Sequence, residues 1–321
     1  MSIFDFFKSK PAANTENQSE SNNYTILHDD GIRAMKMGEV RYAEKCFSQA
    51  LALQDDLQMV KLLAEAKIRL QDFEGALPLI ERIAEAEPEN ADVYLILAQT
   101  YGKLGQYEKM EDVANQLLGS YPENPHVLYL YGEACHYLGE NSPAITYLSM
   151  TLEQQPRYIA PRLLRAQIFL SEAEYDKALE DANVLTELDA ENEDVLLLRA
   201  DALAGSGQAE AAEAAYESLI ALNPFCQEGV LHCANFYRST AHYEKALQVC
   251  NEAIELEPGF ALAYKLRSDI KKDMTDEAGA AEDLRKSLEL QPEKSTSAEG
   301  EFTSVENKMA ERYRDMNPYG F

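Results

Sequence analysis

The chain has 321 residues, of which 56 are Asp or Glu and 29 are Lys or Arg, so its formal charge at pH 7 is −27. Nucleic acid is excluded as a partner, because affinity for it comes mainly from Lys and Arg side chains that neutralise phosphates. With 46% hydrophobic residues the chain can bury a sizeable core, which excludes a wholly disordered or fibrous protein.

Residues 1–23 are predicted to be a flexible N-terminal segment. Residues 8–23 carry no large apolar side chain and cannot offset the entropy lost on ordering. Ahead of them stand Ile3, Phe4, Phe6 and Phe7, for which we consider a frayed end, a docking segment for another protein, or a weak membrane tether. No stretch approaches the run of about 20 apolar residues that spans a bilayer, so no integral membrane segment is expected.

Residues 24–294 contain eight copies of a repeat whose period is 34 residues. The twentieth position of each copy is alanine in seven of the eight: Ala43, Ala76, Met110, Ala144, Ala178, Ala212, Ala246 and Ala280. The eighth position is always small: Gly31, Ala64, Ala98, Gly132, Ala166, Ala200, Ala234 and Ser268. The thirty-second position is proline in six copies, which marks a repeated helix end, because proline cannot continue a helix.

Between these columns the apolar residues recur at steps of three and four. In the third copy they are Tyr94, Leu97, Ala98 and Tyr101, followed by a break at residues 102–105 and then by a second periodic run. This pattern predicts two short helices joined by a turn in every copy. The two small columns let the paired helices approach closely, since only a side chain about the size of a methyl group fits at the crossing.

These columns resemble the tetratricopeptide repeat, whose pattern places a large residue, Leu-Gly, Tyr, Ala, Phe and Pro at fixed offsets. The resemblance covers residues 24–294 and implies an all-α fold, a right-handed superhelical solenoid of eight helix-turn-helix repeats. Three departures concern individual repeats: Arg162 stands at the large first position, Met110 replaces the small residue, and Ala190 replaces the proline.

Residues 295–321 are predicted to be a linker followed by a capping helix. Thr303 and Glu306 have the form of a capping box and Asn317-Pro318 forms a stop, so the helix is expected over residues 304–316. One face of it would carry Val305, Met309, Tyr313 and Met316 and cover the apolar end of the solenoid. Disorder, or occupation of the protein's own groove by residues 319–321, are the alternatives.

The sequence carries no motif that predicts catalysis, a metal site or a cofactor. It lacks a phosphate-binding Gly-x-x-x-x-Gly-Lys loop, a His-Glu-x-x-His pair and a Gly-x-Ser-x-Gly elbow. Gly205-Ser206-Gly207 is interpreted as an inter-helix turn. The five cysteines form no Cys-x-x-Cys pair and are interpreted as reduced thiols of a cytoplasmic protein, with Cys233 and Cys250 in the core.

The first helix of each repeat has a second face that cannot pack within its own hairpin. Its core lies at positions four, seven, eight and eleven, so positions five and nine fall on the opposite side at 100° per residue. In the family that our chain resembles, this face lines the concave surface and binds extended or helical peptides. The predicted partner-binding residues are therefore Leu95, Tyr129, Leu163, Leu197 and Leu231 at position five, and Gln99, Glu133, Gln167, Asp201 and Asn235 at position nine. The alternative is that the leucines pack between neighbouring repeats and the polar row is simply solvated.

The predicted function is to bind a protein or peptide partner as a scaffold or adaptor. Some family members hold acidic chaperone tails through Lys at position five and Asn at position nine, but here Lys61 is paired with Glu65 and Lys265 with Asp269, so this clamp is expected to be absent. A partner of neutral to basic character is expected. A substrate-holding chaperone, a membrane-tethered assembly factor and an enzyme with dispersed catalytic residues are the rival hypotheses.

Overall fold

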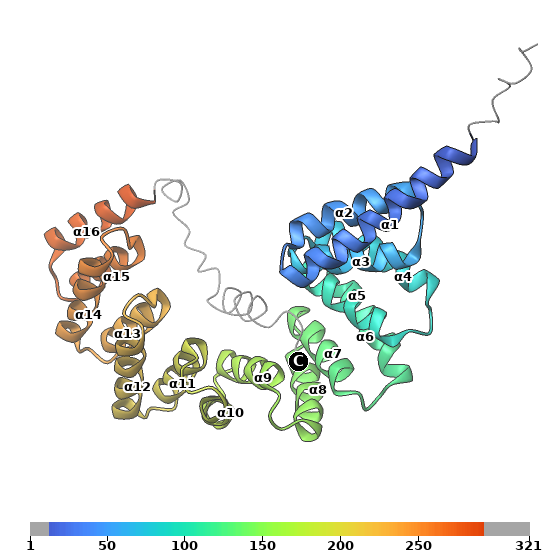
Figure 1. Cartoon of the computed structure of the whole chain (residues 1–321). Helices are drawn as coiled ribbons and strands as arrows, with labels where there is room; N and C mark the ends of the chain where they lie inside the picture. The colour runs from blue at the N-terminus through green and yellow to red at the C-terminus, as the bar shows by residue number, and fades with distance from the viewer. Residues whose placement is uncertain (1–12, 292–321) are drawn as a thin grey trace, which may run out of the picture. The chain divides into compact units, whose positions relative to one another are not determined.

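The computed structural model describes residues 13–291, with side chains from residue 22, and these residues form helices only (Figure 1). The helices are α1 (Ala13–Met37), α2 (Val40–Leu53), α3 (Leu57–Arg69), α4 (Phe73–Ala86), α5 (Ala91–Lys103), α6 (Tyr107–Ser120), α7 (Pro125–Tyr137), α8 (Asn141–Gln154), α9 (Ile159–Ser171), α10 (Tyr175–Leu188), α11 (Glu193–Gly205), α12 (Ala209–Leu222), α13 (Gln227–Ser239), α14 (Tyr243–Leu256), α15 (Ala261–Asp273) and α16 (Glu277–Leu290). Odd-numbered and even-numbered helices are the first and second helices of the eight repeats. The prediction of an all-α solenoid of helix pairs is confirmed.

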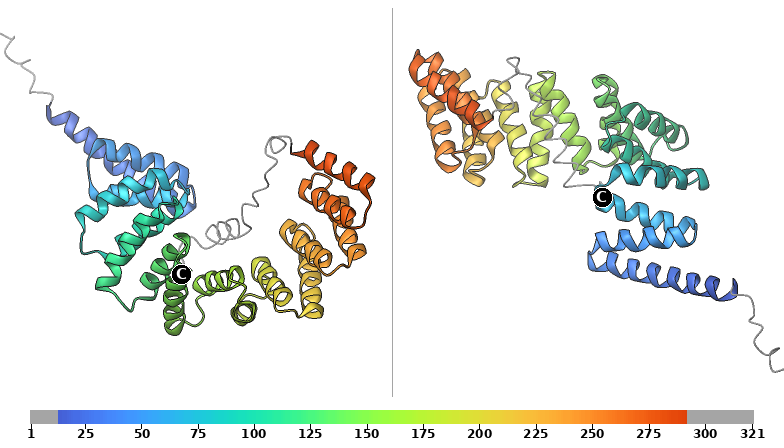
Figure 2. Two further views of the ribbon diagram at one scale, coloured as in Figure 1. Left: turned by 180° about the vertical axis from the view of Figure 1, so that it is seen from behind. Right: turned by 90° about the horizontal axis from the view of Figure 1, so that it is seen from above.

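The chain divides into two compact units between Tyr147 and Leu148, inside α8. In unit 1, which ends at Tyr147, each helix from α1 to α6 packs against the next one along the chain. In unit 2, which begins at Leu148, α9 to α15 do the same, and the hairpins follow one another in chain order within each unit (Figure 2). No helix of the described part is both long and apolar enough to cross a bilayer.

The first helix begins earlier than the sequence analysis predicted. Residues 13–23 were expected to be flexible, but they form the first turns of α1. Extending a helix that is already nucleated costs much less than starting one, which offsets the low helix propensity of the Asn, Ser and Thr residues in this stretch. Residues 1–12, with the apolar group from Ile3 to Phe7, and residues 292–321, with the predicted capping helix, lie outside the described residues.

The two columns of small residues lie in the core, as predicted. Ala178, Ala246 and Ala200 are each 0% exposed, and every other member of both columns is buried as well. The departure at Met110 has a local explanation, because a Cβ atom added to Gly102 would lie 2.8 Å from the Met110 Sδ atom. Gly102 therefore leaves space for the Met110 side chain, which is larger than the alanine of the other copies.

The departure at Arg162 is explained by a buried acid. The Asp181 side chain is 3% exposed and accepts a hydrogen bond of 2.8 Å from Arg162 Nη1, while Arg165 donates to both of its oxygens at 2.8 and 2.7 Å. A paired, hydrogen-bonded charge can be buried where a lone charge cannot. Arg267 makes the same two-pronged contact with buried Asp283 in the last repeat, at 2.8 and 2.6 Å.

All eight inter-helix turns have the same construction. Position fifteen of each repeat has a positive φ, and its occupants are Gly38, Gln71, Gly105, Gly139, Ala173, Gly207, Ala241 and Thr275. The next residue donates its backbone N–H back to the first helix, as in the 2.9 Å bond from Gln106 N to Tyr101 O. This is the Schellman arrangement that ends many helices. It confirms the turn at Ser206-Gly207, and Gly205 is the last residue of α11 before it.

Candidate partner-binding surface

In unit 1 the predicted surface residues come from α5 and α7. Leu95, Gln99, Tyr129 and Glu133 are all partly exposed. Leu95 rests its inner side against the core of unit 1, which contains Leu97 and Ala98 of its own helix. The four side chains occupy positions five and nine on the first helices of two consecutive repeats. Unit 1 therefore presents Leu95 and Tyr129 beside the amide of Gln99 and the carboxylate of Glu133.

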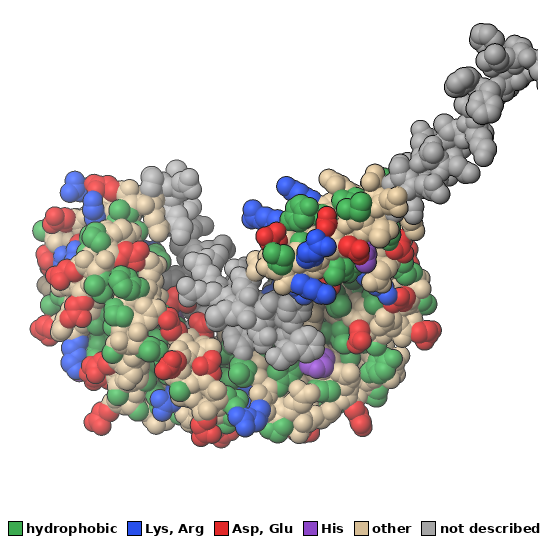
Figure 3. Space-filling model, viewed as in Figure 1, with side chains coloured by type: hydrophobic (Ala, Val, Ile, Leu, Met, Phe, Trp, Pro, Cys, Tyr) green, Lys and Arg blue, Asp and Glu red, His purple; other side chains and the backbone are tan. Residues whose placement is uncertain are grey.

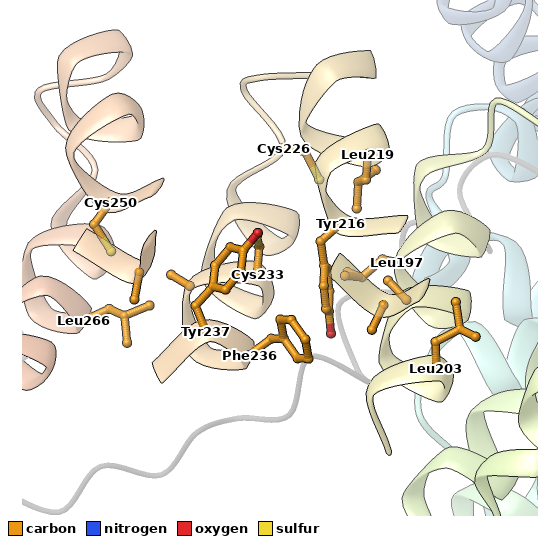
Figure 4. Close-up of a cluster of buried hydrophobic side chains, with 14 of the residues drawn as sticks. Leu197, Leu203, Tyr216, Leu219, Cys226, Cys233, Phe236, Tyr237, Cys250 and Leu266 are labelled. Atoms are coloured by element: carbon orange, nitrogen blue, oxygen red, sulfur yellow. The ribbon is translucent and has the colours of Figure 1, made fainter. Parts of the chain in front are cut away.

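In unit 2 two of the predicted surface leucines are buried, which corrects the sequence analysis. Leu163 of α9 is 3% exposed and packs in a cluster with Leu185 and Val195. Leu197 of α11 is 1% exposed and belongs to the cluster that contains Tyr216 and Cys233, drawn in Figure 4. The alternative that these leucines pack between neighbouring repeats is the right one for both residues. They cannot bury a partner's side chain.

The remaining unit 2 residues of the predicted surface are accessible. Leu231 of α13 is half-buried against the core, Gln167 of α9 is half-buried and Asn235 of α13 is exposed. Among the described residues, the side-chain amides of Gln99, Gln167 and Asn235 have no hydrogen-bond partner. An amide carries two donors and two acceptor lone pairs, so each of the three can bond to a peptide group.

Asp201 occupies a different environment from the one that the sequence analysis predicted. Its carboxylate accepts a 2.5 Å hydrogen bond from the hydroxyl of Tyr216 and lies 2.9 Å from Nδ1 of His232. Its side chain is only 16% exposed. Asp201 thus joins α11, α12 and α13 inside unit 2, and its charge is already engaged within the protein.

Two opposing effects set the protonation of His232. Burial lowers the pKa of the imidazole, but the hydrogen bond to Asp201 and the charge of that carboxylate raise it more, so the pKa lies above its ordinary value of 6.5. Burial, together with the charge of Asp201, also raises the pKa of the Tyr216 hydroxyl, which therefore remains a donor. The sequence analysis treated His232 as a surface polar group, and no local pattern pointed to this contact.

Other polar residues of the same helix face are also paired. Lys61 donates a 2.5 Å hydrogen bond to Glu87, Glu65 accepts from Arg69 at 2.7 Å, and Asp269 lies 3.4 Å from Lys272. Three members of the two lysine and acid pairs, Lys61, Glu65 and Asp269, therefore have other partners within the chain. In the second repeat the carboxylate of Glu87 offsets the charge of Lys61.

One group of possible metal ligands was missed by the sequence analysis. Glu111 of α6, Cys135 of α7 and Glu140 each place one ligand atom within 4.8 Å of the others. Burial, with the charges of the two carboxylates, raises the pKa of the Cys135 thiol to about 11. A metal ion that bound here would have to displace the thiol proton, because it is the thiolate that binds metal ions.

The cysteines lie where the sequence analysis placed them. Cys233 and Cys250 are 1% and 0% exposed, and Figure 4 shows both among the apolar side chains of one cluster. Burial raises the pKa of each thiol to about 12. Buried protonated thiols act as small apolar groups, so these two contribute to packing and not to reactivity.

Comparison with known families and structures gives a consistent result. The family described as Tetratricopeptide repeat matches residues 29–91 and 197–259, and the family described as Anaphase-promoting complex, cyclosome, subunit 3 matches residues 69–151. Among curated proteins, the DnaJ homolog subfamily C member 7 homolog of Schizosaccharomyces pombe is 23% identical over 276 residues, which cover 79% of this chain and 56% of that protein. The chain thus spans little more than half the length of this relative.

Two solved structures share the fold. The C-terminal part of a TPR repeat-containing protein from Cytophaga hutchinsonii has a TM-score of 0.56 at 14% identity, over 73% of this chain and 95% of that one. A tetratricopeptide repeat protein from Parabacteroides merdae has a TM-score of 0.52 at 17% identity, over 84% of this chain and 94% of that one. Similarity at this level of identity concerns the fold.

Proposed function

We propose that this chain, which belongs to the tetratricopeptide-repeat family, holds a protein or peptide partner. The partner would lie on the face of the first helices that carries positions five and nine of the repeat, opposite the hairpin core. Proteins with this fold generally mediate protein-protein interaction. The residues we assign to this role are Leu95, Gln99, Tyr129 and Glu133 in unit 1, and Gln167, Leu231 and Asn235 in unit 2. Leu163, Leu197 and Asp201 are left out, because they are engaged inside unit 2.

The observation that carries this proposal is that both units have amides without a hydrogen-bond partner at the same position of the repeat. Gln99, Gln167 and Asn235 recur at one position of the repeat and have no hydrogen-bond partner among the described residues. Because all three amides are accessible, their donors and acceptors face solvent and are available to a partner. Peptide groups of a partner offer the matching acceptors and donors.

Apolar contact would supply most of the affinity. Leu95 and Leu231 expose part of their side chains beside the amides, and Tyr129 adds an aromatic ring in unit 1. Aromatic residues are enriched among the side chains that dominate binding free energy at interfaces. The net charge of −27 favours a partner of neutral to basic character and speeds its approach.

The proposed role is that of a scaffold or adaptor in the cytoplasm. Five reduced cysteines, all of them buried, suit a compartment that keeps thiols reduced. A substrate-holding chaperone subunit would use the same surface, and similarity to a DnaJ homolog is the observation that favours this second candidate. The two roles differ in the guest, which is folded or a short segment for a scaffold and unfolded for a chaperone.

Quantitative affinity capture from the native cell tests the proposal. One variant carries Gln99→Ala with Tyr129→Ala, and the matched control carries Asn115→Ala with Gln116→Ala, two exposed residues on the second helix α6. We expect at least one partner to be recovered about tenfold less with the first variant and equally with the control. If every partner is recovered equally by both folded variants, the proposal is wrong.

A further inference from the structure

Unit 2 exposes an aromatic residue at a repeat position that carries charge in most other repeats. Position thirty-three lies in the link between one repeat and the next. Its occupants in the second to fifth repeats are Glu89, Glu123, Arg157 and Glu191. In the sixth repeat it is Phe225, whose side chain is 64% exposed. A charged residue suits this solvated link, so the phenylalanine is not needed for the fold.

Phe225 stands in an apolar surface that spans two repeats. The last residues of α12 and α14, Leu222 and Leu256, are 46% and 50% exposed. Phe225 and Leu256 line one shallow notch whose floor is made by Val230 and Phe260. We call Leu222, Phe225 and Leu256 the junction patch. The backbone of Phe225 is fixed, because its N–H donates a 3.0 Å hydrogen bond to Asn223.

The surroundings of the junction patch are acidic. Glu257 lines the notch itself, where it accepts a 2.8 Å hydrogen bond from Gln227, and Glu255 and Glu228 are the direct sequence neighbours of Leu256 and Gln227. Figure 3 shows carboxylates interspersed with apolar side chains over unit 2.

Within the described residues none of these three carboxylates takes part in an ion pair. Between residues 200 and 264 the only Lys or Arg residues are Arg238 and Lys245. Both lie at the opposite end of the hairpin formed by α13 and α14, where they pair with Asp273 and Glu213. The junction patch therefore combines exposed apolar area with carboxylates that form no ion pair among the described residues.

We propose that the junction patch binds an amphipathic helix of another protein, one with leucine-like residues on one face and Lys or Arg along its borders. The apolar face would cover Phe225, Leu222 and Leu256, and the cations would meet Glu257 and its neighbours. A strand would need a sheet edge for pairing, which the helical surface does not provide. A second copy of this chain fits poorly, because a twofold contact would place acid against acid.

The test uses a labelled synthetic helix of about 18 residues, built from leucine and lysine so that one face is apolar. Binding to the full chain is followed by fluorescence anisotropy. Phe225→Glu removes the exposed ring and is expected to weaken binding at least tenfold. This is expected even though the added negative charge would attract the lysines of the peptide. Glu occupies the same position in four other repeats, so this variant should melt like the parent protein. Leu53→Ser is the matched control, since Leu53 ends α2 and is 41% exposed, and it should leave binding unchanged.

Three results would overturn the proposal. Equal or tighter binding by Phe225→Glu would mean that the peptide responds to net charge alone. Equal weakening by Leu53→Ser would mean that any exposed leucine suffices. Self-association of the parent protein that Phe225→Glu abolishes would assign the patch to a second copy. The variant Gln99→Ala with Tyr129→Ala should bind the peptide normally, so failure here and failure of the proposed function can be told apart.

Discussion

Gly205, the last residue of α11, provides a sharp test of how consecutive repeats pack. A Cβ atom built on Gly205 would lie 2.2 Å from Cδ1 and 2.3 Å from Cε1 of Tyr175, the first residue of α10. Carbon atoms in contact normally stay 3.5 to 4.0 Å apart, so the ring would have to move by more than about 1 Å. Overpacking of this kind costs about 1–3 kcal/mol, and Gly205→Ala recovers at most about 1 kcal/mol of helix propensity. We expect a net loss of about 1 kcal/mol.

A double-mutant cycle isolates the steric contribution. With Tyr175→Ala in place, Gly205→Ala should become neutral or stabilising, which gives a coupling free energy of about 1–3 kcal/mol. Urea denaturation followed by far-UV circular dichroism measures the four proteins, and hydrogen exchange in α10 and α11 localises the effect. Gly119→Ala in α6 is the matched control, because no atom lies within 4 Å of its built Cβ, and it should be neutral or stabilising in both backgrounds. Additive effects of Gly205→Ala and Tyr175→Ala would refute the reasoning.

Four further predictions concern other parts of the chain. Thr275→Gly should stabilise the protein by about 1 kcal/mol in urea titrations, because a β-branched residue there has a φ of 66° that glycine adopts without strain. Ala246→Leu should lower stability by about 1–3 kcal/mol, and unchanged melting would count against the repeat alignment. Because the pKa of His232 is raised on folding, its contact with Asp201 should stabilise the protein fully below about pH 6.5, and this stabilisation should be lost as the pH rises through the folded pKa. The difference in urea midpoint between the parent and His232→Gln should therefore shrink as the pH rises. Truncation after Lys294 should lower the melting temperature and promote self-association if residues 295–321 cover the end of the solenoid, and neither change is expected if they do not.

The repeat itself could be predicted from the sequence, because its signals are local and periodic. The geometry of a helix pair is enough to interpret these signals, which are small residues at positions eight and twenty, a helical apolar period and a recurrent proline. The compensation of Met110 by Gly102 was not predicted, because only the packed hairpin shows that the two residues meet. The helix at residues 13–23 was missed, because composition alone does not reveal that a neighbouring helix already supplies the nucleus.

The candidate binding surface depended on contacts that no single helix encodes. Helical periodicity placed Leu95, Leu163, Leu197 and Leu231 on one face, but it could not distinguish those that the next repeat covers. Tertiary packing buried Leu163 and Leu197 and left the other two accessible, because burial depends on side chains that lie a whole repeat away in the sequence. The capture of Asp201 by Tyr216 and His232 has the same origin, with partners 15 and 31 residues distant. The sequence by itself thus determined the helix pairs and their order, while only the stacking of one pair on the next decided which side chains remain available to a partner.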